Sequence, residues 1–412
     1  MKNAGRKSNK ILSHKGNELY YVVSCVLKNK RGILNLASKH KTPFYVFDQK
    51  TLDDSINLFL NSFKKELPSF KAYYAMKINH HPFIIKYAVE KGLGLDVGSP
   101  REVDMAIEAG CKDILYFSPG KTEDDLRHAL KYSSVITINM DSFSELEKLG
   151  RLTNHLKTKI KAGIRVHTDL SGDWKKYGIH ITNLKKFWEK AKKYPFIDLS
   201  GIHFHMSRNK DASFYENTIK ELGAYLKNKI MTGDLRRIKY IDFGGGFEVY
   251  ESEGIIQKAK QGHDYLVRDA IKIDAYAKKI GTAIRTHLSP ILDTTYYSEP
   301  GRIICNDSMF VVLSVADKKD DNNVVLDGGV NMVGWQRFEY EYFPLVNISN
   351  SSKKEIECNM WGNLCTTWDI WGYRCYSKKI REGDFIVVPN QGALTYSLAQ
   401  NFIQPIPPVY KL

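Results

Sequence analysis

Three segments, far apart in the sequence, carry residue types from which an amine-based active site can be built. Lys77 follows the apolar run YYAM, so its alkyl stem leaves an apolar wall and its amine is expected to be partly desolvated. Desolvation lowers the pKa of a lysine and makes the neutral amine available as a nucleophile. A single lysine in this lysine-rich chain is most simply a surface residue, so the assignment depends on the other two segments.

The second segment is Gly244-Gly245-Gly246, which follows the strand-like run IKYIDF. Without Cβ atoms, such a turn lets backbone N–H groups approach a phosphate, although glycine triplets also form plain turns. In the third segment, SEPGR, Arg302 could add a fixed cation to the same phosphate. An amine nucleophile facing a phosphate cradle suggests pyridoxal 5′-phosphate (PLP), and Glu299 is a candidate for keeping its pyridine nitrogen protonated.

Two histidines offer a different chemistry. His203 and His205 lie two residues apart in a predicted strand, so their side chains share one face and could ligate a metal ion. No evident carboxylate ligand accompanies them, and a metal site would leave Lys77 and the glycine triplet unexplained. We therefore expect no metal, with one histidine stacked on the cofactor ring and the other a hydrogen-bonded core residue.

The elements that must position these residues alternate regularly between residues 44 and 302. Eight short apolar runs read as strands: 70–77, 93–99, 114–120, 135–140, 161–167, 199–205, 238–246 and 296–302. Amphipathic helical segments separate them, which predicts a TIM-like (β/α)8 barrel with its active site at the carboxyl ends of the strands. A doubly wound open sheet is the alternative, but its glycine-rich turn would follow the first strand, whereas here the triplet follows the seventh.

After residue 302 the long helices disappear. Runs such as MFVVLSVA (309–316), NVVLDGG (323–329) and FIVVP (385–389) alternate with turns, which is typical of an antiparallel β-barrel or sandwich. The early runs YYVVSCVL (20–27) and TPFYVFD (42–48) have no place in the barrel and are predicted to be strands of this second domain. The predicted domains are therefore a barrel over 47–302 and a β domain formed by 1–46 with 303–412.

Composition limits the partners of this protein. The chain has 412 residues, 43% hydrophobic and 12% aromatic, which is typical of a folded globular protein. Its net charge is +15, but no helix-turn-helix, zinc finger or aromatic-interleaved basic repeat points to nucleic acid. Six cysteines without a C-x-x-C spacing favour a reducing cytoplasm, and no run of 18 apolar residues predicts a membrane span.

Seven motifs, YYAMKIN, LDVGSPREV, GIHFHMS, DFGGGF, SEPGR, WGNLCTTWD and GALTYSLAQNF, occur in this order over about residues 40–403. In order and spacing they resemble the fold-type III PLP-dependent decarboxylases, the family of the ornithine, arginine and diaminopimelate decarboxylases. The local sequence is most similar to the D-ornithine/D-lysine decarboxylase branch. The resemblance implies an alanine-racemase-like barrel followed by a β domain, in a homodimer whose active sites lie at the interface. It also implies that a basic or diamino amino acid loses CO2 to give an amine.

The resemblance assigns roles to individual residues. Lys77 resembles the Schiff-base lysine, His205 the imidazole stacked on the ring, and Glu299 the carboxylate at the pyridine nitrogen. Cys365 resembles the cysteine that reaches into the partner's site and returns a proton to the product. Further matches to the family's cofactor-binding motifs are Gly245, Gly246, Pro300, Gly301 and Arg302, and matches near the lysine are Asp96, Ser99, Glu102 and Arg165.

Two departures from the family pattern concern the phosphate. The family usually reads H-x-G-S where this chain has HMSR, so Arg208 replaces a serine and becomes a candidate phosphate contact. The family's G-A-Y appears as GAL, so Tyr396, two residues further on, is a candidate substitute for the missing tyrosine.

A third departure concerns the substrate. The residue after the cysteine is commonly an acid that binds the distal ammonium, but here it is Thr366. Glu339, Glu341 and Asp369 are candidate replacements, although Asp369 could equally be structural. Arg337 lies near the position of a substrate-binding arginine in diaminopimelate decarboxylases and could meet a carboxylate.

Two alternatives use the same fold. An amino-acid racemase would pair the pyridine nitrogen with an arginine, so Glu299 argues against it. A non-catalytic PLP-binding protein would correspond to the small barrel-only relatives, and the C-terminal domain with Cys365 argues against that alternative.

Overall fold

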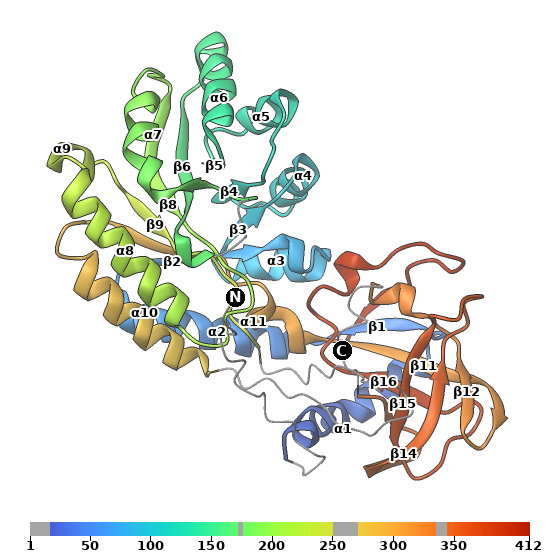
Figure 1. Cartoon of the computed structure of the whole chain (residues 1–412). Helices are drawn as coiled ribbons and strands as arrows, with labels where there is room; N and C mark the ends of the chain where they lie inside the picture. Colours follow the sequence, from blue (N-terminus) through green and yellow to red (C-terminus); the bar gives the residue numbers. More distant parts are fainter. Residues whose placement is uncertain (1–16, 172–175, 250–270, 335–343) are drawn as a thin grey trace, which may run out of the picture. The chain divides into compact units, whose positions relative to one another are not determined.

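The protein is described from a computed structural model, which covers residues 17–171, 176–249, 271–334 and 344–412 (Figure 1). The chain forms two compact units, of which the first contains Asp54–Glu248 and Ala270–Ile304. The second consists mainly of the described residues up to Asp53 and of Cys305–Leu412. The barrel unit begins at Asp54 and ends at Ile304, where the sequence predicts residues 47 and 302.

The first unit is built on eight parallel strands, which confirms the predicted TIM-like barrel. The strand order is β5-β4-β3-β2-β10-β9-β8-β6, and pairing of β5 with β6 closes the barrel; the short β7 adds to β6. The strands are β2 (Phe70–Ala75), β3 (Gly94–Val97), β4 (Ile114–Phe117), β5 (Ile136–Met140), β6 (Ile160–His167), β7 (Ile179–His180), β8 (Ile197–His203), β9 (Tyr240–Asp242) and β10 (Thr295–Ser298). Each of the eight barrel strands overlaps one of the eight predicted runs.

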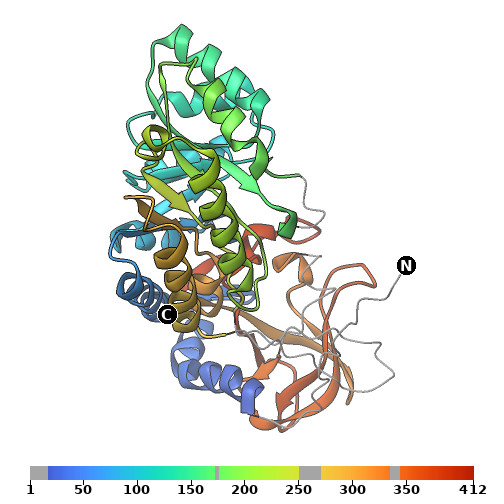
Figure 2. The ribbon, with the colours of Figure 1, turned by 60° about the vertical axis from the view of Figure 1, so that its left-hand side comes forward.

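Helices follow or precede these strands along the unit. They are α2 (Gln49–Glu66), α3 (Pro82–Glu90), α4 (Pro100–Glu108), α5 (Glu123–Leu130), α6 (Phe143–Leu156), α7 (Leu184–Ala191), α8 (Ser213–Lys229), α9 (Thr232–Leu235), α10 (Ile273–His287) and α11 (Arg302–Cys305). The helices α8 and α10 pack side by side, as both views show, and a Cβ at Gly223 would lie 2.5 Å from the carbonyl oxygen of His287 (Figures 1 and 2). Among the described helices of the chain, none is long and apolar enough to cross a membrane.

One tyrosine fills the barrel interior below the site. The ring of Tyr240 occupies the space left by Gly163 and Gly201, where a Cβ would come within 2.2 Å and 1.9 Å of the tyrosine. Its hydroxyl donates to Oδ1 of Asn139 at 2.6 Å. Glycines in these two strands therefore reflect close packing, a common reason for glycine within a strand.

The second unit is a closed β barrel with two added strands. The order β12-β14-β15-β13-β16-β11 closes through a β11–β12 pairing, and β1 and β17 extend the sheet from β11. Five of the described strand pairs are antiparallel and three are parallel. The strands are β1 (Phe44–Phe47), β11 (Met309–Asp320), β12 (Asn323–Leu326), β13 (Val346–Asn347), β14 (Ser351–Trp361), β15 (Ile370–Ser377), β16 (Phe385–Val388) and β17 (Val409–Lys411).

The prediction of a strand over residues 20–27 is wrong, because this segment lies within helix α1 (Asn17–Ala37). Val23, Val26 and Ile33 are fully buried in the core of the second unit, together with Phe44 and Val46 of β1. Their spacing places them along one face of a helix. The β-branched residues of this run favour a strand locally, but packing of the helix against the β barrel outweighs that preference. The segment does belong to the second unit, as predicted.

Candidate active site

A cavity of about 450 Å³ lies at the carboxyl ends of the barrel strands, where the sequence predicts the site. The residues that line it are Lys77, Gly98, Ser99, Glu102, Phe117, Ser118, Pro119, Arg165, Val166, His167, Tyr177, His205, Met206, Ser207 and Glu299. The structure thus gathers the predicted Lys77, His205 and Glu299 around one space, although Lys77 and Glu299 are 222 residues apart in the sequence.

Lys77 stands in a 3-10 turn directly after β2, and about half of its side chain is exposed. Its Nζ lies 3.1 Å from Oδ2 of Asp96 at the end of the neighbouring strand β3. Burial alone would lower the pKa of Lys77, as the sequence predicts. The charges of Asp96 and Glu299 outweigh burial and raise that pKa above its ordinary value, so the amine is an ammonium here.

Asp96 is buried, and burial together with the charge of Glu299 raises its pKa to about 7, against the opposing effect of Lys77. Asp96 therefore titrates near neutral pH beside the charged amine of Lys77. Next to it, Ser99 caps α4 by accepting the backbone N–H of Glu102, and Glu102 accepts the N–H of Gly98. This reciprocal capping explains why the D-x-x-S-x-x-E motif holds one shape.

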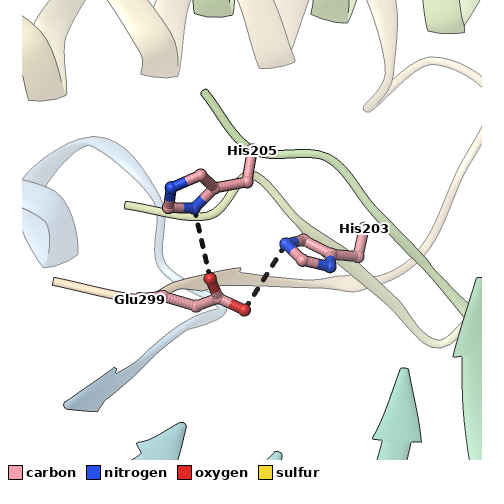
Figure 3. Close-up of side chains that lie close together, drawn as sticks. All are labelled: His203, His205 and Glu299. Atoms are coloured by element: carbon pink, nitrogen blue, oxygen red, sulfur yellow. Dashed lines mark ion pairs between the residues drawn. The ribbon is translucent and has the colours of Figure 1, made fainter. Parts of the chain in front are cut away.

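Glu299 follows β10, with only 2% of its side chain exposed, and faces two histidines (Figure 3). Its Oε1 is 3.4 Å from Nε2 of His203, and its Oε2 is 3.3 Å from Nδ1 of His205. Burial favours the neutral acid, but contacts with both histidines and the charge of Lys77 hold the pKa of Glu299 well below its usual range. Glu299 is therefore a carboxylate.

The histidine pair faces one carboxylate. His203 is completely buried, and its Nε2 lies 3.4 Å from Oε1 of Glu299, so this core histidine has a polar neighbour. The carboxylate that the sequence did not reveal beside the pair is Glu299. Burial lowers the pKa of His205 to about 4 despite Glu299, which makes its ring neutral at pH 7, and the backbone N–H of Gly245 donates to its Nδ1 at 3.0 Å.

Backbone crowding explains the glycines of the predicted cradle. A Cβ at Gly245 would lie 2.1 Å from the carbonyl oxygen of Glu299, and one at Gly246 would lie 1.9 Å from that of Met206. Gly246 also has φ +84°, a conformation that favours glycine. Because His205 takes the N–H of Gly245, the N–H of Gly246 is the better candidate for a phosphate.

The SEPGR segment packs against the turn that carries the lysine. Ala75 donates its backbone N–H to the carbonyl oxygen of Pro300 at 3.1 Å. A Cβ at Gly301 would lie 2.4 Å from the side chain of Ile78. The glycine therefore lets this segment, and Glu299 within it, approach Lys77 closely.

Arg165, at the end region of β6, is held between two aromatic rings that sequence reasoning missed. Its guanidinium carbon is 4.5 Å from the ring centroids of both Phe117 and Tyr177. One of its nitrogens donates to the carbonyl oxygen of His205 at 3.2 Å. The stack fixes a cation on the cavity wall, and no local motif signals it because the three residues come from different segments.

A buried ion pair beneath this wall also escaped the sequence analysis. The ammonium of Lys121 is fully buried, 2.9 Å from Glu145, and donates to the carbonyl oxygens of Ser118 and Asn139. It also lies 5.3 Å from the centroid of the Phe117 ring. The pair joins the ends of β4 and β5 to α6; the only sequence signal was the S-x-x-E cap of that helix.

Other predicted phosphate contacts occupy varied positions. Arg208 is exposed and has φ +58° in the loop after His205, and Arg302 opens α11 and is partly buried. Tyr396 belongs to the second unit, where its ring meets the edge of Tyr45 at 5.6 Å between centroids.

The loop between β14 and β15 carries the predicted cysteine. Cys365 is exposed, and Thr366 is partly buried. Asp369 is 2% exposed, and its two oxygens accept the backbone N–H groups of Val330 and Leu364 at 2.8 and 2.7 Å. These bonds favour the structural alternative for Asp369.

Three predicted substrate contacts, Arg337, Glu339 and Glu341, lie outside the described residues.

A family model for "Pyridoxal-dependent decarboxylase, pyridoxal binding domain" matches residues 53–306, which include the whole cavity lining. The chain belongs to this family. Pyridoxal phosphate is therefore its cofactor, and the protein is a pyridoxal-dependent decarboxylase, as the motif series predicts. The glycine turn that a Cβ would fill, the amine of Lys77 and the buried Glu299 beside the cavity fit that cofactor.

Relatives of this decarboxylase match nearly its whole length. A diaminopimelate decarboxylase from Aquifex aeolicus is 25% identical over 383 residues, which cover 89% of this chain and 85% of the relative. The diaminopimelate decarboxylase from Helicobacter pylori is 27% identical over 388 residues, 89% of each chain.

Solved structures show the same fold. The diaminopimelate decarboxylase from Helicobacter pylori complexed with L-lysine has a TM-score of 0.76 at 22% identity, covering 92% of this chain and 94% of that one. The lysine/ornithine decarboxylase from Vibrio vulnificus complexed with putrescine has a TM-score of 0.77 at 21% identity, covering 93% and 98%.

The histidine pair and Glu299 also meet the geometric condition for a metal site, since their ligand atoms lie within 4.8 Å of one another. The sequence predicts no metal here, and that remains a prediction.

Proposed function

We propose that this decarboxylase removes the α-carboxylate of a diamino acid, with diaminopimelate, lysine and ornithine as the substrates to test first. The observation that carries the proposal is the convergence of Lys77, His205 and the Glu299 carboxylate on one cavity. The relatives reported above, named for diaminopimelate, lysine and ornithine, support the substrate class. The family match supports this reaction over the racemase and carrier alternatives.

When bound, PLP would supply an electron sink for the bond between Cα and the α-carboxylate. The residues of the site would hold the cofactor and set its charge. Glu299 holds a negative charge where the ring nitrogen must stay protonated, and Lys77 supplies the amine that holds the cofactor and releases the product. The ring of His205 is neutral, so it could stack on the cofactor without adding a positive charge of its own. Gly246 and Arg302 are the proposed phosphate ligands, with Arg208 and Tyr396 as further candidates.

Recognition of the distal end of the substrate should differ from that in relatives with an acid after the cysteine. Thr366 cannot neutralise a distal ammonium, and desolvating an unpaired ammonium costs several kcal/mol. A substrate with a second carboxylate would offset part of this desolvation cost, because Arg337 could bind that carboxylate. Otherwise Glu339 or Glu341 must provide the charge, and a D-amino acid would present its side chain in a different direction.

We also propose that the enzyme is a cytoplasmic homodimer with shared sites, in which Cys365 returns a proton to the product across the interface. Cys365 is exposed on its own chain, and the nearby Trp368 is 61% exposed. An exposed aromatic side chain beside an exposed thiol suits a surface that a second copy covers. All the described cysteines are free, which agrees with a reducing compartment.

The decisive experiment measures CO2 release from meso-diaminopimelate and from both enantiomers of lysine, ornithine and arginine. We expect kcat/KM to favour one diamino acid by at least an order of magnitude. A Thr366→Glu variant should shift the preference toward substrates with a distal ammonium. Release of CO2 from none of these acids by PLP-loaded protein would refute the proposed substrate class.

Subunit mixing tests the shared site. A Lys77→Ala chain mixed with a Cys365→Ala chain should regain part of the activity, because one of the two sites in a mixed dimer is then intact. Absence of recovery, despite proven exchange of subunits, would place both residues in one chain's site or make Cys365 dispensable.

A further inference from the structure

A second carboxyl group lies against Glu299 and has no role in the site described so far. Asp242 is the last residue of β9, is completely buried, and is the register partner of His203 in β8. Its Oδ1 accepts the backbone N–H of Gly244 at 2.9 Å. Glu299 donates its backbone N–H to the carbonyl oxygen of the same Gly244 at 2.9 Å, which brings Glu299 next to Asp242, and the two side chains interact.

Neither carboxyl group has enough donors. Within the part of the chain that the structure describes, Oδ2 of Asp242 is buried without a hydrogen-bond partner, and Oε1 of Glu299 has only the long 3.4 Å contact with Nε2 of His203. Two carboxylate oxygens cannot bond each other, but one proton between the groups turns the repulsion into a charge-assisted hydrogen bond. The proton must reside mainly on one of the two residues.

The surrounding charges decide which residue takes the proton. Lys77 and Arg165 are the cations of this cluster, and both act on Glu299. Asp242 instead faces the negative charges of Glu299 and Asp96.

Other groups around Asp242 add no cation. The neighbouring phenols Tyr240 and Tyr297 are uncharged at pH 7, because burial raises the pKa of both. Burial lowers the pKa of His203, so this histidine is also neutral. Burial and the charge of Glu299 raise the pKa of Asp242 well above its usual range.

We propose that Asp242 is a neutral carboxylic acid that donates its O–H to Glu299 and so positions an ionised Glu299 for the ring nitrogen of the cofactor. Asp242 is a positioning residue, because it acts through Glu299. The role of Glu299 rests on the proposed function, whereas the protonation of Asp242 can be tested without cofactor.

The first test uses the apoprotein and the variant Asp242→Asn, whose amide is also neutral and can also donate. A carboxyl group with a raised folded pKa takes up a proton on folding, so the contribution of Asp242 to wild-type stability falls as pH rises above the unfolded value of about 3.9. Asp242→Asn lacks this uptake. Its unfolding constant relative to wild type should therefore fall up to tenfold per pH unit between pH 6 and 9.

The control is Asp198→Asn, a change of an exposed aspartate at the start region of β8. It should show the same pH dependence of unfolding as the wild type. Infrared spectra of apoprotein labelled with 13C-aspartate should contain a protonated-carboxyl band that Asp242→Asn removes and Asp198→Asn retains. Equal pH dependence in wild type and Asp242→Asn, or no such band, would overturn the inference.

The second test uses the loaded enzyme. Asp242→Val removes the donor, so Glu299 should bind a proton more readily and the acid limb of the kcat profile should move to higher pH. Asp242→Asn should move that limb back toward the wild-type position. An acid limb at the same pH in all three proteins would contradict the proposed positioning.

The two proposals can fail separately. If the apoprotein results hold but the protein releases no CO2 from any amino acid, only the proposed function fails. If CO2 is released and Asp242→Asn lacks the pH-dependent gain in stability, only the present inference fails.

Discussion

The ammonium of Lys77 lies 3.1 Å from the carboxylate of Asp96, which is buried on the next strand. This contact reverses the expected effect of burial on Lys77 and keeps the amine charged. Before Lys77 can act as a nucleophile, its proton must move, and Asp96, with a pKa raised to about 7 by burial and Glu299, is the nearest acceptor. The contact with Asp96 therefore keeps the amine of Lys77 protonated.

Lys77 should be the residue that carries the cofactor. Protein reconstituted with PLP should be yellow, and borohydride should fix the cofactor irreversibly onto Lys77, as peptide mapping by mass spectrometry can show. Lys121→Arg is a useful control, because that lysine is buried away from the cavity lining and should not be labelled in the wild type. A label on another lysine would refute the assignment.

Replacing Glu299 by Gln should preserve most cofactor binding but slow decarboxylation about a hundredfold, which corresponds to roughly 3 kcal/mol of lost electrostatic stabilisation. The comparison is single-turnover CO2 release by wild type, Glu299→Gln and the exposed Glu123→Gln. Glu123→Gln should match the wild type. Near-normal turnover in Glu299→Gln would mean that the ring nitrogen has another partner.

His205 should make the apoprotein lose stability in acid. Its pKa falls from 6.5 to about 4 on folding because of burial, so the unfolded chain binds a proton that the folded chain does not. The contribution of His205 to the free energy of unfolding is complete above pH 6.5. It declines as pH falls toward 4, by up to about 1.4 kcal/mol per pH unit. Urea unfolding at several pH values should show this slope reduced in His205→Phe; His203 supplies a second contribution of the same sign.

The buried pair of Lys121 and Glu145 gives a stability prediction. Lys121→Met leaves Glu145 buried without its cation and should cost about 3–5 kcal/mol in the free energy of unfolding. Adding Glu145→Gln should recover part of the loss, because the unpaired charge disappears. The exposed Lys131→Met should change stability by less than about 0.5 kcal/mol. A loss in Lys121→Met no larger than that of Lys131→Met would show that the pair contributes little.

The barrel, and the strand ends that carry Lys77, His205 and Glu299, could be predicted from the sequence alone. Eight apolar runs with helical segments between them place the ends of the strands at one rim, because parallel strands in a closed barrel share their direction. Lys77, His205 and Glu299 follow three of those strands, so their meeting was predictable without coordinates. The series of motifs added the cofactor and the reaction.

The charge states of the site residues, and the contacts that hold these residues in place, could not be predicted from the sequence. The pKa of Lys77 depends on Asp96 and Glu299, and the fixed position of Arg165 depends on Phe117 and Tyr177; these distances arise when separate segments pack. Helix α1 was mistaken for a strand because its β-branched residues favour a strand locally, whereas its burial against the β barrel selects the helix. Local patterns fix which strand end a residue occupies, but the balance between desolvation and neighbouring charge exists only after the chain has folded.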